Sequence, residues 1–145
     1  MPEYTAKATT TAGRNGHVDS ADGLIHFDLS VPKEMGGPGK AGATNPEQLF
    51  AAGYSACFGG AIAFVAGQEK IKPESVHVEA DVTIHADPAM LQTDPSKGFK
   101  LAVVLKCTLD GIERAEAERL VHKAHEVCPY SKATRNNIDV TLEVV

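Results

Sequence analysis

Three cysteines are the residues of this chain best suited to redox or nucleophilic chemistry. Cys57 stands in an uncharged stretch, Cys128 directly precedes Pro129, and Cys107 belongs to an alternating apolar pattern. Cys57 and Cys128 both fall at expected helix ends, so a redox pair is one interpretation. The alternative is that both are buried cysteines that act as small hydrophobic side chains. Cys107 is expected to fill the core.

A cysteine that attacks a peroxide needs help to ionise. An ordinary thiol has a pKa of ~8.5, and lowering it by about two units requires roughly 2.7 kcal/mol. A helix N-terminus contributes typically ~0.3–1 kcal/mol and about 2 at best. A neighbouring cation is therefore expected. Arg14 and Arg135 are the candidates, because Arg114 and Arg119 lie on the solvated face of a predicted helix.

An arginine that activates a thiolate and binds a peroxide oxygen needs a carboxylate to hold it. Glu47, in the first turn of a predicted helix, can serve this purpose for Arg14. The alternative is that Arg14 is a solvated turn residue and Glu47 a first-turn acid favoured by the helix dipole. The residues alone leave both interpretations open.

The histidines provide a second possible chemistry. His122, His125 and Cys128 are three residues apart, a spacing that would suit a Zn site or a Cys-His hydrolase pair. No Cys-x-x-Cys cluster accompanies them and no glycine-rich nucleotide fingerprint is present, so we expect no metal and no bound cofactor. Three other histidines lie on the polar faces of predicted strands and should face solvent or a partner: His26, His77 and His85.

The segment that must position Cys57 is a predicted pair of helices. Asn45 can cap the first helix and Pro46 fits its first position. Gly53 predicts a break, after which Ser55 can cap a second helix with Cys57 in its first turn. This central helical segment spans residues 45–70. It is uncharged from Cys57 to residue 67, so it should be buried in a core or an interface.

Strands flank the central helices on both sides. Residues 4–31 predict a three-stranded meander, with hairpin signals at Asn15-Gly16, of type I′, and at residues 22–23. Residues 75–145 predict two strands, a helix and a last strand. Helices and strands do not alternate singly, so we expect an α+β fold in a single domain, residues 1–145.

Charge and hydropathy limit the partners. The net charge of −5, without a Lys/Arg cluster, argues against nucleic acids and anionic membranes. The sequence shows neither a signal peptide nor a run of 18 apolar residues, so we expect a cytoplasmic protein outside the membrane. The central helix is apolar all round, which suggests that one subunit does not cover it and that the chain dimerises.

Two long motifs carry a resemblance to a known family. They are Asn-Pro-Glu-Gln-Leu-Phe-Ala-Ala-Gly-Tyr-Ser-Ala-Cys-Phe (Asn45–Phe58) and Val-Cys-Pro-Tyr-Ser-Lys-Ala-Thr-Arg-Asn-Asn (Val127–Asn137). Both closely resemble the organic hydroperoxide resistance (Ohr) proteins of the OsmC superfamily, and the resemblance covers essentially the whole chain. It implies an OsmC-like fold with mainly antiparallel sheets around a long buried central helix. It also implies an intertwined homodimer with two active sites at the interface.

The resemblance also assigns roles to residues. Cys57 matches the peroxidatic cysteine and Cys128 the resolving one, which together form a disulfide. Arg14 and Glu47 match the arginine and glutamate that activate Cys57. The substrates implied are alkyl and fatty-acid hydroperoxides. We expect Phe50, Phe58 and the glycine-rich stretch 36–42 to offer an apolar lining for them. The implied reductant is dihydrolipoamide or a lipoylated protein. Two alternatives are a non-catalytic OsmC-like ligand-binding or stress protein and a Cys-His hydrolase.

Overall fold

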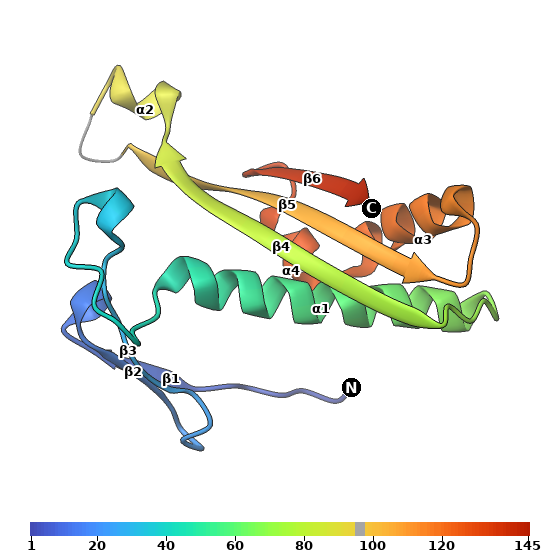
Figure 1. The fold of residues 1–145 in the computed structure, drawn as a ribbon, viewed down its shortest axis with the longest axis horizontal. Coiled ribbons are helices and arrows are strands. Elements are labelled where there is room, and N and C mark those ends of the chain that lie inside the picture. The colour runs from blue at the N-terminus through green and yellow to red at the C-terminus, as the bar shows by residue number, and fades with distance from the viewer. Residues whose placement is uncertain (95–97) are drawn as a thin grey trace. The chain divides into compact units, whose positions relative to one another are not determined.

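The computed structural model describes residues 1–94 and 98–145, which form two compact units. The first unit comprises Met1–Leu49 and the second Phe50–Val145. Strands and helices follow one another in the order shown in Figure 1. The predicted α+β class is confirmed.

The first unit contains a three-stranded antiparallel sheet in the order β1-β2-β3. The strands are β1 (Ala8–Thr11), β2 (His17–Ser20) and β3 (His26–Asp28), and a 3₁₀ turn, η2 (Lys33–Met35), follows them. The meander is thus present, with shorter strands than predicted. Its register pairs His17 with Asp28 and Asp19 with His26 across β2 and β3.

The first hairpin does not turn at Asn15-Gly16 as a type I′ turn. A 3₁₀ turn, η1 (Gly13–Asn15), makes the connection, with Ala12 and Gly13 in the left-handed region at φ 58° and 54°. Gly16 has φ −114°. Glycine is required there for close packing, because a Cβ atom would lie 1.6 Å from the carbonyl oxygen of Thr11.

The central segment is one continuous helix, α1 (Pro46–Gln68), and the predicted break at Gly53 was wrong. The start was correct: the Asn45 side chain accepts a hydrogen bond from the backbone N–H of Gln48 at 2.9 Å. Gly53 instead allows close contact with Tyr130, whose hydroxyl would lie 2.6 Å from an added Cβ. Ser55 does not cap a new helix, because its hydroxyl donates back to the Ala52 carbonyl at 3.1 Å.

The second unit is built on a sheet in the order β4-β5-β6. β4 (Ser75–Ala86) pairs antiparallel with β5 (Phe99–Asp110), and β5 pairs parallel with β6 (Asp139–Val144). A parallel pair needs a crossover, which α3 (Arg114–Val127) and α4 (Pro129–Thr134) supply. A short helix, α2 (Pro88–Leu91), lies in the connection between β4 and β5, of which residues 95–97 lie outside the described residues.

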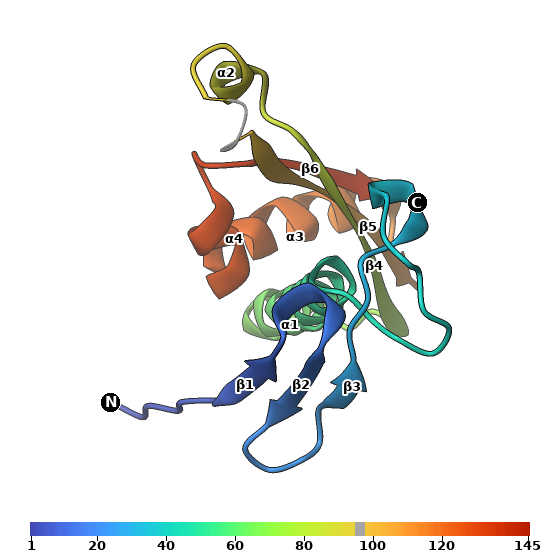
Figure 2. The ribbon, with the colours of Figure 1, turned by 90° about the vertical axis from the view of Figure 1, so that its left-hand side faces the viewer.

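The core of this unit lies between one face of the sheet and the helices α1 and α3, as Figures 1 and 2 show. Every second residue of β5 from Val103 to Leu109 is buried, as the alternating pattern predicted. α1 contributes Tyr54, Phe58 and Ile62 to this core, all three fully buried. The face of α1 that holds these side chains is therefore fixed by packing.

The opposite face of α1 stays open within one chain. It consists of small apolar residues and one phenylalanine: Ala52, Ala56, Gly60, Ala63, Phe64 and Gly67. Phe64 is 57% exposed. By length and composition α1 could also span a membrane, which the sequence prediction did not anticipate. That finding weighs little alone, because a core helix of a soluble protein passes the same test.

Candidate active site

Two of the three cysteines are in direct contact. The Cys128 thiol donates a hydrogen bond to the Cys57 sulfur at an Sγ–Sγ distance of 3.5 Å. Cys57 is partly exposed and Cys128 is fully buried. A disulfide needs the two sulfurs at about 2.05 Å, so a small movement would join them. The arrangement can therefore support thiol–disulfide chemistry, with Cys57 as the thiol that solvent reaches.

Cys128 occupies the junction between two helices. It ends α3 and begins α4, with extended backbone angles of φ −64° and ψ 124°. Pro129 imposes this conformation, because a proline disfavours helical geometry in the residue before it. Cys128 is therefore outside helical geometry. The chain bends there and brings the Cys128 thiol back to α1.

Cys57 lies in the middle of α1, the twelfth of its 23 residues, and not in a first helical turn. The dipole of its own helix therefore gives the thiolate little support, since that effect is confined to the helix ends. Burial raises the pKa of the Cys57 thiol, a hydrogen bond from the backbone N–H of Tyr130 lowers it, and contact with Cys128 raises it. The net shift is upward. Within one chain Cys57 is thus less acidic than an ordinary thiol, and a cation is needed to reverse this.

A buried hydrogen-bond network holds α4 against α1 next to the thiols. The Tyr54 hydroxyl bonds to Ser131 at 2.9 Å and to Thr134 at 3.1 Å. His125 Nδ1 bonds to the Ser131 hydroxyl at 2.8 Å. Tyr54 is three residues before Cys57 on α1, so the network fixes the helix face that carries the thiol.

His125 is committed to this network and does not serve Cys57. Burial lowers the pKa of His125, which favours the neutral imidazole. Within the described part of the chain, the Cys57 sulfur has hydrogen bonds with Cys128 and with the backbone of Tyr130. Among the described residues, His122 and His125 form neither a metal-ligand group with Cys128 nor a pair with Cys57, so the hydrolase alternative gains no support.

Arg14 and Glu47 form a second pair, within the first unit. Both terminal nitrogens of the Arg14 guanidinium donate to the Glu47 carboxylate, at 3.1 and 2.8 Å. The Arg14 side chain is 46% exposed and the Glu47 side chain 12%. The hydrogen bond raises the pKa of Arg14 and lowers that of Glu47, so both groups stay charged. The bidentate geometry fixes the guanidinium plane and leaves other N–H groups for a ligand.

A family model described as OsmC-like protein matches residues 37–143. An organic hydroperoxide resistance protein of Xanthomonas axonopodis pv. citri is 51% identical over 140 residues, covering 96% of this chain and 92% of that protein. The chain belongs to the OsmC/Ohr family. The resemblance read from the two cysteine motifs is thereby confirmed.

Solved OsmC/Ohr structures share the fold. The organic hydroperoxide resistance protein OsmC of Legionella pneumophila is 51% identical with a TM-score of 0.88, covering 99% of this chain and 98% of that one. OhrB of Bacillus subtilis is 44% identical with a TM-score of 0.86, covering 98% of each chain. The chain therefore has the OsmC/Ohr fold over nearly its whole length.

Three further residues can be placed in this OsmC/Ohr fold. Cys107 is fully buried on β5, where burial raises its pKa to about 11, so the core-filling prediction is confirmed. Arg135, the second cation candidate, donates to the backbone carbonyl of His125. Phe58 is fully buried in the core, so the expectation that it lines a substrate pocket was wrong.

Sequence reasoning missed the network of Tyr54, Ser131 and Thr134. Its signal is present in the chain: Tyr54 and Cys57 lie three apart on one helix, and Ser131 follows Cys128 by three residues. A polar residue at helical spacing from a reactive one shares its face. The partners come from α1 and α4, so only the fold could show that they meet.

Proposed function

We propose that this chain is a cysteine peroxidase that reduces organic hydroperoxides to alcohols and so protects the cell against oxidative stress. Relatives named organic hydroperoxide resistance proteins, 45–51% identical over nearly the full length, support this role. The observation that carries the proposal is the contact of the Cys57 and Cys128 thiols at 3.5 Å. Cys57 is the partly exposed member, so it is the one that meets the peroxide.

The proposed reaction has three steps. The Cys57 thiolate attacks the distal peroxide oxygen, the O–O bond breaks, and the departing alkoxide takes a proton to become the alcohol. Cys57 is then a sulfenic acid, and Cys128 displaces its hydroxyl as water to form the Cys57–Cys128 disulfide. A dihydrolipoyl dithiol, free or on a protein, exchanges with this disulfide and restores both thiols.

We further propose that Arg14, held by Glu47, supplies the cation that Cys57 lacks. The resemblance to Ohr proteins implies active sites at a dimer interface, so we infer that the Arg14–Glu47 pair acts on the Cys57 of a second chain.

The open apolar face of α1 supports a homodimer. A contiguous apolar surface on a soluble protein is a typical contact surface, and small residues let two helices approach closely. We propose that two copies associate through this face, cytoplasmic in location. Such a dimer would have two sites.

The decisive assay for the function measures hydroperoxide consumption by the purified chain. We expect turnover of cumene hydroperoxide with dihydrolipoamide, slower turnover of hydrogen peroxide, and none when the dithiol is omitted. An apolar substrate is preferred because Cys57 packs against the hydrophobic core. If neither peroxide is consumed while both thiols are reduced, the protein is a non-catalytic member of its family.

Replacing Cys128 with serine should separate the first step from the second. The first attack on the peroxide still proceeds, but the Cys57 sulfenic acid finds no partner, so steady-state turnover falls by roughly tenfold or more and Cys57 overoxidises. Intact-mass spectrometry after one equivalent of peroxide should show one or more added oxygens. A steady state equal to that of the unmodified chain would mean that another thiol resolves the sulfenic acid.

A further inference from the structure

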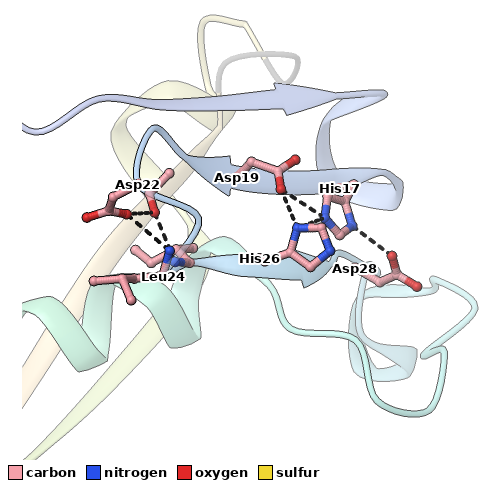
Figure 3. A network of polar contacts seen from close by, with 8 residues as sticks. His17, Asp19, Asp22, Leu24, His26 and Asp28 are labelled. Atoms are coloured by element: carbon pink, nitrogen blue, oxygen red, sulfur yellow. Dashed lines mark hydrogen bonds and ion pairs between the residues drawn. The ribbon is translucent and has the colours of Figure 1, made fainter.

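Three ligand-type side chains converge on the β2–β3 hairpin, within the first unit (Figure 3). His17 Nε2 lies 3.2 Å from His26 Nδ1 and 3.4 Å from Asp19 Oδ1. His26 Nδ1 also hydrogen-bonds to the same Asp19 oxygen. The three atoms thus form a small triangle of two imidazole nitrogens and one carboxylate oxygen.

The size of this triangle matches the face of a metal coordination shell. Zn²⁺ binds nitrogen and oxygen ligands at about 2.0–2.2 Å, and two such ligands of a tetrahedral ion stand about 3.4 Å apart. The His17–His26 and His17–Asp19 separations are 3.2 and 3.4 Å. A single ion above the triangle would reach all three atoms with small side-chain rotations.

A second layer of contacts orients His17 for this role. Its other ring nitrogen, Nδ1, bonds to Asp28 Oδ1 at 2.8 Å, and Lys40 Nζ donates to the other oxygen of Asp28 at 2.6 Å. When Nδ1 carries the proton and donates it to Asp28, the lone pair of Nε2 is free to bind an ion at the triangle. Metal-binding histidines almost always donate their second ring N–H to a carboxylate, a backbone carbonyl or water. The contacts of Lys40 with Asp28 and of Asp28 with His17 are therefore a second observation, outside the triangle, that favours metal binding by His17.

The register of the hairpin explains why these residues meet. Asp19 faces His26 across β2 and β3, and His17 is two positions before Asp19 on the same face of the sheet. The side chain of Asp19 is 46% exposed, that of His26 69% and that of His17 29%. An ion could therefore enter from solvent and keep water in its remaining coordination positions.

We propose that His17, Asp19 and His26 bind one divalent transition-metal ion, with Zn²⁺ as the reference ion. Two imidazoles and one carboxylate suit Zn²⁺ and its first-row neighbours and disfavour Ca²⁺ and Mg²⁺, which take oxygen ligands. The ion takes the place of the direct hydrogen bonds among the three atoms and links β2 to β3. The site is separate from the cysteine chemistry, so the peroxidase proposal does not depend on it.

The test is Zn²⁺ titration of the full, untagged chain by calorimetry, in a Cys57→Ser/Cys128→Ser background that removes these two thiols as competing ligands. We expect one Zn²⁺ per chain and a Zn²⁺-dependent rise in the unfolding temperature. His26→Gln should weaken binding at least tenfold. His77→Gln, which removes an exposed histidine of β4, is the matched control and should bind like its parent.

Asp28→Asn provides a second measurement that leaves all three ligands in place. We expect it to weaken Zn²⁺ binding by roughly 10–100-fold, the usual effect of losing the carboxylate behind a metal-binding histidine. Equal Zn²⁺ affinity in the parent, His26→Gln and His77→Gln would overturn the proposal, as would the absence of any binding to the parent. Circular dichroism of each variant shows whether a loss of binding comes from misfolding.

Discussion

Replacement of Cys57 with serine is expected to abolish turnover of organic hydroperoxides, with a fall in rate of roughly three orders of magnitude or more. A serine hydroxyl at this position is nearly isosteric, but it neither ionises near neutral pH nor forms a sulfenic acid. The fold should persist because Cys57 is only partly buried and its neighbours Tyr54 and Phe58 hold the helix in the core. Peroxide consumption and the unfolding temperature, measured together, check this.

The matched control for this variant is Cys107→Ala. It also removes one thiol, but from the core of β5, so it should lower stability while leaving the peroxidase rate of the folded protein unchanged. Full activity in Cys57→Ser would exclude Cys57 as the attacking residue. Loss of activity in Cys107→Ala alone would mean that Cys107, and not Cys57, carries the chemistry.

Replacement of Arg14 with alanine is expected to slow the peroxidase about 100-fold at neutral pH. Burial and Cys128 raise the pKa of Cys57, and the guanidinium must lower it. Each unit of pKa above the working pH reduces the thiolate about tenfold, and about two units are at stake. The rate should rise with pH as the thiol ionises, and the profile of Arg14→Ala should move to higher pH. The deficit should therefore shrink in alkaline buffer.

Two further variants serve as comparisons for Arg14→Ala. Arg14→Lys keeps the charge but loses the bidentate contact with Glu47, so its rate should fall between those of the other two proteins. Arg114→Ala removes a surface arginine of α3 and should leave the pH profile unchanged. A neutral-pH rate for Arg14→Ala within twofold of the unmodified chain would contradict the assignment.

Co-expression of two impaired chains tests which subunit supplies the arginine. In a dimer of one Arg14→Ala chain and one Cys57→Ser chain, an arginine acting across the interface leaves one complete site. Activity near half that of the unmodified dimer is then expected. If the arginine acts within its own chain, every site of the mixed dimer is defective and no activity returns.

Local patterns predicted the strands and the start of α1 because their signals lie within a few residues. The alternation along β5 predicted its buried face, and Asn45 with Pro46 predicted where α1 begins. Gly53 was taken as a helix breaker because glycine weakens helices in isolation. Its actual role depends on Tyr130, which is 77 residues later in the chain and therefore invisible to a local pattern.

The candidate site shows the same division. The sequence and its family resemblance could single out Cys57, Cys128, Arg14 and Glu47 as candidates, and the structure brings them together as two pairs. The sequence could not predict the mid-helix position of Cys57, which leaves the thiolate without the support of a helix N-terminus. The contact of His17 with His26 was also missed, because it depends on the register of β2 and β3.

Cys128, the extended residue between α3 and α4, can move in a way that Cys57 cannot. Cys57 is held on both sides by helical hydrogen bonds, so its sulfur can move only by rotation about its own side chain. Cys128 lies where two helices meet, and a change in its backbone angles rotates α4 relative to α3. Disulfide formation should therefore change the backbone angles at Cys128 and leave the backbone of α1 unchanged. Reduced and oxidised forms would then differ in amide hydrogen exchange along α4, while α1 keeps its protection.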